Sequence, residues 1–208
     1  QEWERSDPTK IQEALLALSE SPRVSPPLRV YAGLLHAYAK RRRGDLPGSQ
    51  EAIRKLGYVD RWLVAGPFDN EGKTGLLREE MPERERRDAF TSGKSYPGKE
   101  RPVRFREAPH AFMNGWIDFG SLVRPQEFVC AYAATYVTSG DGKNVPRQVS
   151  LWAGSAGAMR VYWNGEEVIR DEKYRSLDAD RFATNVTLQP GWNRLLVKVC
   201  GDDDAPLL

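Results

Sequence analysis

The chain has 208 residues, 40% hydrophobic and 29% charged, a composition typical of a globular protein with a core of its own. Lys and Arg total 31 against 29 Asp and Glu; the resulting net charge of +2 is a smaller basic excess than a nucleic-acid groove usually carries. No stretch approaches the roughly 20 apolar residues of a membrane-spanning helix. We therefore expect no nucleic-acid partner and no direct membrane span.

Residues 1–57 are predicted to form a helical segment of two to three helices. Ser6-Asp7-Pro8 is a helix start, and a second helix begins at Ser25-Pro26, because Pro suits the first helical position. A third, short helix is predicted over 49–56, capped by Ser49 and closed by Gly57. Two antiparallel helices followed by a third resemble a piece of a helical-repeat array such as tetratricopeptide repeats.

Residues 58–208 are predicted to form an antiparallel β-sandwich, because short strands follow one another with turn residues between them. Asn164-Gly165 predicts a tight hairpin. An apolar strand over 61–68 precedes a charged segment, 69–100, which we expect to be a long surface loop. The candidate strands beyond residue 101 are 103–106, 116–122, 128–139, 147–153, 160–163, 167–170, 184–188 and 193–200.

Both ends of the sequence are abrupt, and we expect a fragment of a longer protein. The chain starts at Gln1 and carries no signal-peptide pattern. Cys130 and Cys200 both lie in predicted strands, and they can form a disulfide only if those strands are neighbours. The sequence leaves that pairing open.

The order of several motifs after residue 60 resembles the galactose-binding-like jelly-roll modules that occur as accessory domains in large bacterial proteins. Such modules accompany glycoside hydrolases, or tetratricopeptide repeats combined with transglutaminase-like domains. The resemblance implies a jelly-roll β-sandwich and a location in the cell envelope or outside the cell, with a cytoplasmic location still open. It rests on residues 62–68 (WLVAGPF), 96–99 (YPGK), 115–120 (GWIDFG), 131–137 (AYAATYV), 161–165 (VYWNG) and 188–199 (LQPGWNRLLVKV).

One departure from these modules concerns ligand binding. Related modules often carry two aspartates in the turn before the Asn-Gly hairpin, whereas this chain has Ala156 and Gly157 there. Without carboxylates, an ion or a sugar hydroxyl loses its strongest acceptors at this turn. If the parent protein is transglutaminase-like, the resemblance places its catalytic Cys, His and acid outside this chain.

Catalysis needs a nucleophile and a base within hydrogen-bond reach, and the chain offers little of either. His36 lies among apolar positions of the second predicted helix, where we expect a packed histidine. His110 has no evident partner in the sequence. Two His and two Cys also leave little material for a metal centre. We therefore expect no enzyme activity, no catalytic residues, no cofactor and no metal.

Four residues are the candidates for ligand binding. Asp178 and Asp180 form the best acidic loop, although they supply too few oxygens for calcium without help from the backbone. Most of the six Trp are expected to fill the sandwich core, but Trp152 and Trp192 lie next to turns and are the ones expected to face a ligand.

The sequence therefore favours a non-catalytic accessory module of a larger bacterial cell-envelope or secreted protein. Its expected partners are another protein or other domains of its own parent chain. The alternative is a carbohydrate-binding module that targets a separate catalytic domain and uses a glycan as its ligand.

Overall fold

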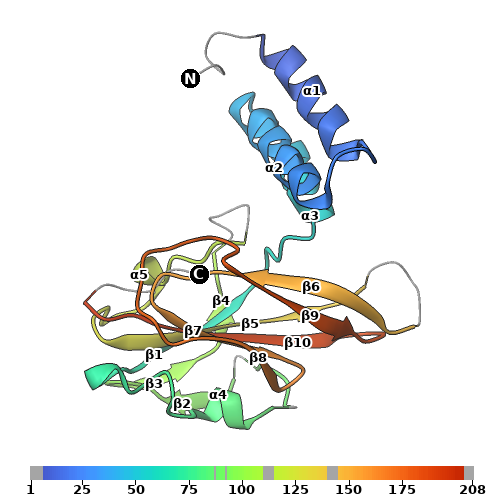
Figure 1. Ribbon diagram of the computed structural model, residues 1–208. Coiled ribbons are helices and arrows are strands. Elements are labelled where there is room, and N and C mark those ends of the chain that lie inside the picture. Colours follow the sequence, from blue (N-terminus) through green and yellow to red (C-terminus); the bar gives the residue numbers. More distant parts are fainter. Residues whose placement is uncertain (1–6, 87, 92, 110–114, 140–144, 204–208) are drawn as a thin grey trace. The chain divides into compact units, whose positions relative to one another are not determined.

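The computed structural model describes residues 7–86, 88–91, 93–109, 115–139 and 145–203 (Figure 1). The chain mixes helices with a larger set of antiparallel strands. It divides into two compact units: a helical unit over Gln1–Asp60 together with Ala111–Gly115, and a β unit formed by Arg61–His110 and Trp116–Leu208. Within the described ranges, no helix combines the length and the apolar character needed to cross a bilayer.

The helical unit consists of α1 (Pro8–Glu20), α2 (Pro26–Arg42) and α3 (Leu46–Lys55). Helix α1 begins where the sequence predicts, because the Asp7 side chain accepts a hydrogen bond from the Thr9 backbone N–H at 2.9 Å. The imidazole of His36 is buried on α2, and its Nδ1 lies 3.1 Å from the carbonyl oxygen of Gln12 on α1. His36 is therefore a packing residue that joins two helices.

Helix α3 starts earlier than predicted. Asp45, and not Ser49, caps it: the Asp45 carboxylate accepts from the Gly48 backbone N–H at 3.0 Å. Ser49 lies inside the helix and is fully buried, and its hydroxyl donates to the carbonyl oxygen of Ala37 on α2 at 2.6 Å. A hydroxyl can satisfy either role, and its burial against α2 decided between them.

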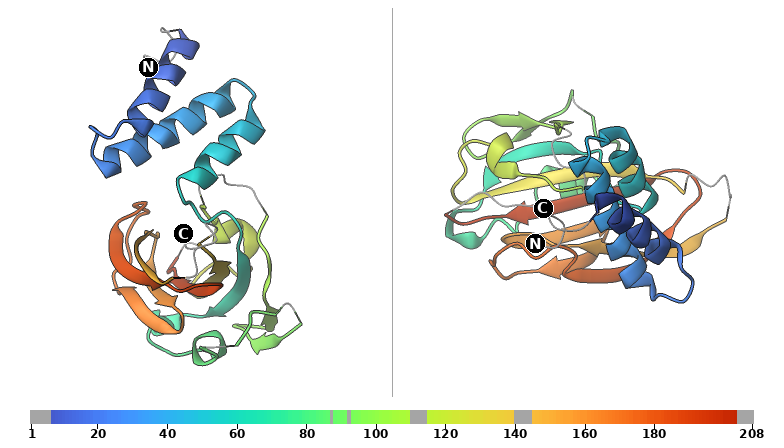
Figure 2. Two further views of the ribbon diagram at one scale, coloured as in Figure 1. Left: turned by 90° about the vertical axis from the view of Figure 1, so that its right-hand side faces the viewer. Right: turned by 90° about the horizontal axis from the view of Figure 1, so that it is seen from above.

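A six-stranded antiparallel sheet is the centre of the β unit, with strand order β4-β1-β5-β10-β7-β8 (Figures 1 and 2). Two strand pairs stand apart from it, β6 with β9 and β2 with β3. The strands are β1 (Leu63–Asp69), β2 (Ser95–Pro97), β3 (Pro102–Arg104), β4 (Arg106–Glu107), β5 (Val129–Val137), β6 (Arg147–Ala153), β7 (Ala158–Trp163), β8 (Glu166–Asp171), β9 (Phe182–Leu188) and β10 (Asn193–Cys200). The short helical turns are η2 (Glu71–Lys73), α4 (Met81–Arg84) and α5 (Phe119–Leu122).

One face of the central sheet packs against the β6–β9 pair. Alternate residues of β5 and β10, such as Ala131 and Val197, point into this core and meet Val186 and Leu188 of β9. Trp163 also lies in this core, and its indole N–H donates to the carbonyl oxygen of Thr187 at 2.8 Å. The result is two antiparallel layers over a shared apolar interior.

The opposite face of the sheet is covered by the segment that we expected to be a surface loop, 69–100. Many described residues of the segment are exposed, as expected of a surface segment, but Leu76, Phe90 and Tyr96 are buried in a second core with Tyr132 of β5 and correct that expectation. The segment has few apolar residues, and their irregular spacing gives no periodic signal. Its contacts with the sheet show that it is a second covering layer.

Residues 116–122 are a second correction. We predicted a strand there, whereas Phe119–Leu122 forms the short helix α5. The Asp118 side chain caps it by accepting from the Ser121 backbone N–H at 3.3 Å. Phe119 is fully buried. An aromatic-rich run with a capping Asp can form a helical turn as readily as a strand, and the cap decides here.

Two further expectations can be followed in the β unit. The Asn164-Gly165 hairpin is confirmed: it joins β7 to β8, and both residues have positive φ, 50° and 87°. Cys130 and Cys200 lie directly opposite each other on β5 and β10 and form a disulfide. The neighbouring-strand condition that the sequence left open is therefore met.

Candidate functional site

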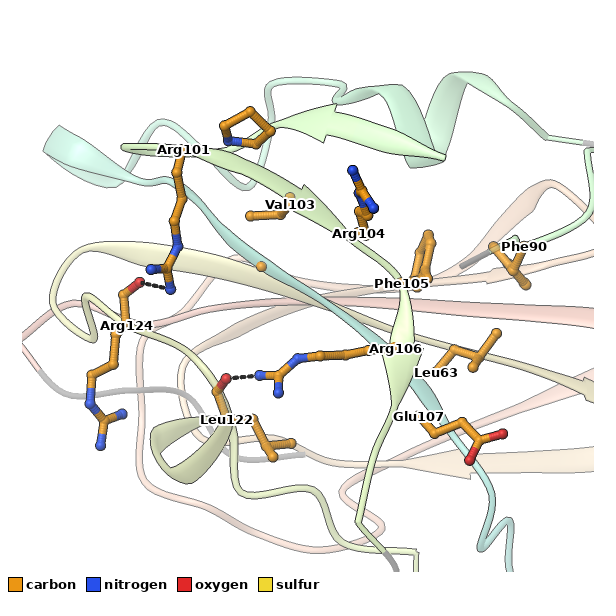
Figure 3. A pocket seen from close by; sticks show the side chains of 12 residues that line it. Leu63, Phe90, Arg101, Val103, Arg104, Phe105, Arg106, Glu107, Leu122 and Arg124 are labelled. Carbon is orange, nitrogen blue, oxygen red and sulfur yellow. Dashed lines mark hydrogen bonds between the residues drawn. The ribbon is translucent and has the colours of Figure 1, made fainter. Parts of the chain in front are cut away.

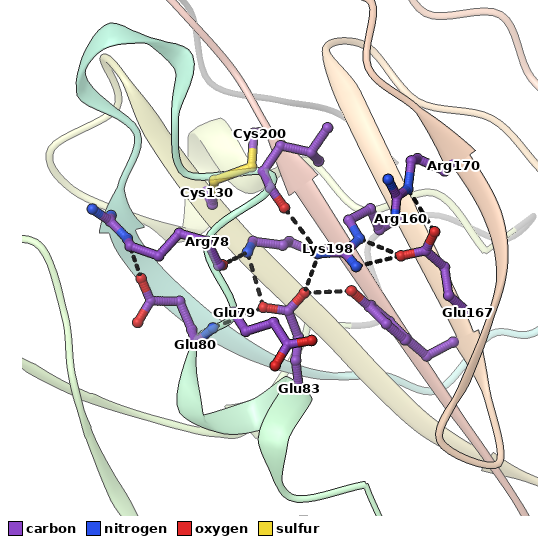
Figure 4. A network of polar contacts seen from close by, with 12 residues as sticks. Arg78, Glu79, Glu80, Glu83, Cys130, Arg160, Glu167, Arg170, Lys198 and Cys200 are labelled. Carbon is purple, nitrogen blue, oxygen red and sulfur yellow. Dashed lines mark hydrogen bonds and ion pairs between the residues drawn. A yellow bond between two sulfur atoms is a disulfide. The ribbon is translucent and has the colours of Figure 1, made fainter.

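A buried carboxylate on α4 is the centre of a network of hydrogen bonds and ion pairs in the β unit (Figure 4). Glu83 is almost fully buried and accepts hydrogen bonds from the hydroxyls of Tyr132 at 2.7 Å and Tyr162 at 2.5 Å. The ammonium of Lys198, which has no exposed surface, lies 2.9 Å from Glu83, and the guanidinium of Arg160 lies 3.3 Å away. We call these five residues the Glu83 network.

The electrostatics of the Glu83 network follow from burial. Burial lowers the pKa of Lys198, and the nearby Glu83 opposes that shift. Burial raises the pKa of Tyr132 and of Tyr162, and the hydrogen bonds to Glu83 act in the same direction. Because both carboxylate oxygens already accept from protein groups, the network is a clamp that holds α4 on the sheet, and nothing in this geometry leaves Glu83 open to a substrate.

The two predicted tryptophans are both exposed, but they lie on different elements. Trp192 is 71% exposed in the turn before β10. Its ring packs edge-to-face with that of Tyr136, with 6.4 Å between the two ring centroids. Trp152 is 54% exposed on β6, opposite Ala183 of β9. Trp3, another of the six, lies outside the described residues.

Trp152 shares the outer face of the β6–β9 pair with uncharged polar side chains. Gln148 donates to the hydroxyl of Thr187 at 2.8 Å, and the Ser150 hydroxyl lies 3.1 Å from the side-chain oxygen of Asn185. Strand alternation places these side chains and Trp152 on one side, because Val149, Leu151 and Ala153 point into the core. This face therefore combines one aromatic ring with amides and hydroxyls.

The two predicted aspartates differ in their surroundings. The Asp178 carboxylate lies 2.9 Å from the guanidinium of Arg181, which neutralises it. Burial raises the pKa of Asp180, which disfavours the charged form that a cation would need. Among the residues that the structure describes, no group of three or more His, Cys, Asp or Glu is placed to hold a metal. His110 lies outside the described residues.

An open groove of about 930 Å³ lies in the β unit, and sequence reasoning missed it (Figure 3). It runs between the extended stretch 101–107 and the end of α5, at the sheet edge formed by β4 and β1. Buried apolar side chains, including Val103 and Phe105, contribute to its lining. Four arginines and one glutamate also line it: Arg101, Arg104, Arg106, Arg124 and Glu107. We call it the arginine groove.

Three of the four arginines of the arginine groove donate hydrogen bonds to backbone carbonyl oxygens. Arg101 donates to the carbonyl oxygen of Arg124 at 3.3 Å, and Arg106 donates to that of Leu122. Arg124 itself donates to the carbonyl oxygens of Gly120 and Val123. Within the described part of the chain, none of the four arginines forms an ion pair. The alternation of Arg104 and Arg106 with Val103 and Phe105 was the sequence signal for this surface.

The helical unit carries a different kind of surface. Among the described residues, α1 buries none of its own side chains fully. On α2, Leu28 and Tyr31 are 60% and 59% exposed. With the partly buried Leu35 they follow the i, i+3, i+7 spacing of one helix stripe. We call this partly exposed apolar row the Leu28–Tyr31 stripe.

Comparisons with known proteins add little to this geometry. No protein-family model matches the sequence, and no curated protein matches it either. Among solved structures, a β-glucuronidase from an uncultured Clostridium species is similar over 67% of this chain, with 16% identity and a TM-score of 0.37. The matched region spans 20% of that chain.

Proposed function

We propose that the chain is a non-catalytic accessory module that makes contacts with another protein or with other domains of a larger parent protein. One observation carries this proposal: the helical unit leaves large hydrophobic side chains exposed. Of the twelve such exposed side chains among the described residues, six lie in this shorter unit: Leu16, Leu18, Leu28, Val30, Tyr31 and Leu46.

Helical repeats bury their apolar faces by stacking on the next repeat, so an unstacked repeat exposes a stripe. The Leu28–Tyr31 stripe of α2 has that character, and a further helix of the parent chain or of a partner would cover it. This supports the resemblance of α1–α3 to tetratricopeptide-like helices.

We further propose a jelly-roll, galactose-binding-like architecture for the β unit and a location in the bacterial cell envelope or outside the cell. The two antiparallel layers and the Asn164-Gly165 hairpin support the architecture. The disulfide between Cys130 and Cys200 supports the location, because disulfides persist in oxidising compartments and are rare in the cytosol.

The test uses the remainder of the parent protein, produced as a separate polypeptide, and measures its affinity for this chain by calorimetry. The double variant Leu28→Ser/Tyr31→Ser is expected to weaken binding at least about tenfold, because buried aromatic and aliphatic anchors dominate interfaces. Leu77→Ser is the matched control, since Leu77 is 57% exposed in the β unit. The proposal would be contradicted if the double variant bound with the same affinity as the unmodified 208-residue chain. Turnover of ester, amide or glycoside substrates by this chain would also contradict it.

A second candidate function, carbohydrate binding, is favoured by the outer face of the β6–β9 pair. An indole ring can stack on the apolar face of a sugar, while neighbouring amides and hydroxyls exchange hydrogen bonds with its hydroxyl groups. Trp152 supplies the ring, and Gln148 and Asn185 supply the amides.

A panel of neutral oligosaccharides tests this candidate through thermal stability, since a ligand selective for the folded state raises the melting temperature. We expect any shift to disappear in Trp152→Ala and to remain in Trp116→Ala, which removes another exposed indole. A shift that survives in Trp152→Ala would exclude this face as the sugar site.

A further inference from the structure

The arginine groove is a candidate binding surface in its own right. We propose that it binds an acidic protein segment in an extended conformation. The proposal goes beyond the function proposed above, which depends on the apolar stripe of the helical unit. Either can fail without the other, because the two surfaces share no residue.

The charge of the arginine groove favours an acidic occupant. Each guanidinium has five N–H donors. In the described part of the chain, the guanidiniums of Arg101 and Arg106 donate to backbone carbonyl oxygens, which carry no net charge. The side chain of Arg104 has no hydrogen bond or ion pair with any residue in the described ranges. Among the described residues that line the groove, Glu107 is the only acidic one. Carboxylates are the protein groups that match this surplus of donors, because Arg binds them through two parallel hydrogen bonds.

The spacing of the arginines favours an extended occupant. The stretch 102–106 alternates between exposed and buried residues, so Arg104 and Arg106 are exposed while Val103 and Phe105 point inward. Residues two apart on an extended chain are about 6.7 Å apart. An extended peptide with a glutamate at every second position repeats at the same distance. Its carboxylates can therefore meet both guanidiniums in register.

Within the described part of the chain, the backbone of β4 has groups without a strand partner that such a segment could use. β4 is the edge strand of the central sheet, and it pairs with β1 only on one side. The Ala108 N–H donates to the Trp62 carbonyl oxygen at 2.8 Å, which makes residues 62 and 108 a hydrogen-bonded pair of the antiparallel ladder. Since such pairs alternate, Leu63 and Glu107 form a non-hydrogen-bonded pair. The Glu107 N–H and C=O therefore point away from β1, toward the open edge.

These backbone groups distinguish a peptide from an anionic glycan. A peptide that lies along β4 can exchange main-chain hydrogen bonds with Glu107 while its acidic side chains reach the arginines. A polyuronate offers the same negative charge but no main-chain donors and acceptors at strand spacing. The observations therefore favour the peptide.

The experiment measures fluorescence anisotropy of a short labelled peptide in which Glu and Thr alternate, titrated with the whole chain. The comparison peptide has the same composition, with its glutamates contiguous. We expect the alternating peptide to bind more tightly than the comparison peptide. We also expect its affinity to fall as salt is raised, because exposed charges are screened.

Variants locate the site on the chain. Arg104→Gln/Arg106→Gln is expected to weaken binding of the alternating peptide about tenfold, the combined effect of two partly exposed charge pairs. Arg23→Gln/Arg41→Gln removes the same charge from exposed arginines of the helical unit and is expected to keep the parent affinity. All four arginines are exposed, so circular dichroism should show that both variants fold like the parent chain.

Three outcomes would overturn the proposal. Equal binding of the two peptides would show that the spacing of the arginines selects nothing. Equal losses in the two double variants would show a response to net charge alone. Tight binding of a polyuronate of matched charge, with weak binding of the alternating peptide, would assign the groove to an anionic glycan.

Discussion

The two units of the chain bury their apolar side chains to different extents. The β unit covers both faces of one sheet, with a core against β6–β9 on one side and a core under the 69–100 segment on the other. In the helical unit, the described residues of α1 include none that is fully buried, and α2 exposes Leu28 and Tyr31. The β unit therefore has an apolar core on each face of its central sheet, whereas the helical unit leaves apolar side chains of α2 exposed to solvent.

The units also differ in whether their ion-paired side chains are buried or exposed. The β unit buries Lys198, Arg160 and Glu83 together, which costs desolvation but fixes where α4 lies on the sheet. In the helical unit, ion pairs such as Lys40–Asp45 lie at the surface, where they contribute little. The difference predicts large effects from polar substitutions in the β unit and small ones in the helical unit.

The largest effect is expected from Glu83→Ala. Removing this carboxylate leaves the ammonium of Lys198 and the guanidinium of Arg160 without their shared buried partner. We expect a loss of about 3–5 kcal/mol in the free energy of unfolding, measured by urea denaturation. Glu79→Ala is the control, because Glu79 faces Arg86 at the surface at 3.7 Å and should change stability by less than about 1 kcal/mol. Similar losses of unfolding free energy in both variants would mean that the buried Glu83 contributes no more to stability than a surface glutamate.

Loss of the disulfide should have the next largest effect. Cys130 and Cys200 are separated by 70 residues, so the bond closes a long loop in the unfolded chain. Reduction, or the double variant Cys130→Ser/Cys200→Ser, is expected to lower the free energy of unfolding by about 2–4 kcal/mol. The loss should be confined to the β unit. If reduction changes the unfolding of α1–α3 as much, the two units do not unfold separately.

Alkaline pH should weaken the β unit through its buried tyrosines. Because burial raises the pKa of Tyr132 and Tyr162, the folded chain keeps protons that the unfolded chain releases above about pH 10. The stability that these phenols contribute is present below that pH. It then falls by about 1.4 kcal/mol per pH unit for each tyrosine.

Lys198 acts in the opposite direction over a different window. Burial lowers its pKa, so stability rises with pH from the folded value up to the ordinary lysine value of about 10.4 and is constant above it. Between pH 10.5 and 12 the Lys198 contribution is constant, so the difference in slope between Tyr162→Phe and the unmodified chain, measured by urea denaturation, reports on Tyr162. Tyr162→Phe should make that slope less steep by about 1.4 kcal/mol per pH unit. An unchanged slope in Tyr162→Phe would contradict the assignment.

The strands and helices with regular patterns could be predicted from the sequence, and the layer that covers the second sheet face could not. β6 and β10 have the bounds that alternation and turn residues indicate. In β10, the same alternation places Lys198 opposite the apolar face, which would normally mean solvent, but the 69–100 segment covers it. No local signal separates Glu83 from the other acids of that segment, because its role depends on Tyr132, Tyr162 and Lys198, which are distant in sequence.

The candidate sites follow the same division. The exposure of Trp152 and Trp192 could be predicted, because both lie next to turns of regular strands. The alternation of Arg104 and Arg106 could be seen in the sequence, but the groove as a whole could not be predicted, since it also needs Leu122 and Arg124 in contact with Arg106 and Arg101. The sequence pattern instead predicted a strand over 116–122. A strand there gives no indication that Leu122 and Arg124 line a groove.

The smallest effect is expected in the helical unit, from Ser49→Ala. The variant removes the buried hydrogen bond to the Ala37 carbonyl oxygen that ties α3 to α2, at a cost of about 1 kcal/mol. Ser19→Ala is the control, because the Ser19 hydroxyl bonds only within α1, to Leu16. Hydrogen exchange should show faster exchange of α2 and α3 amides, with the amides of β5 and β10 unchanged. Faster exchange in β5 as well would mean that the stability of the β unit depends on that of the helical unit.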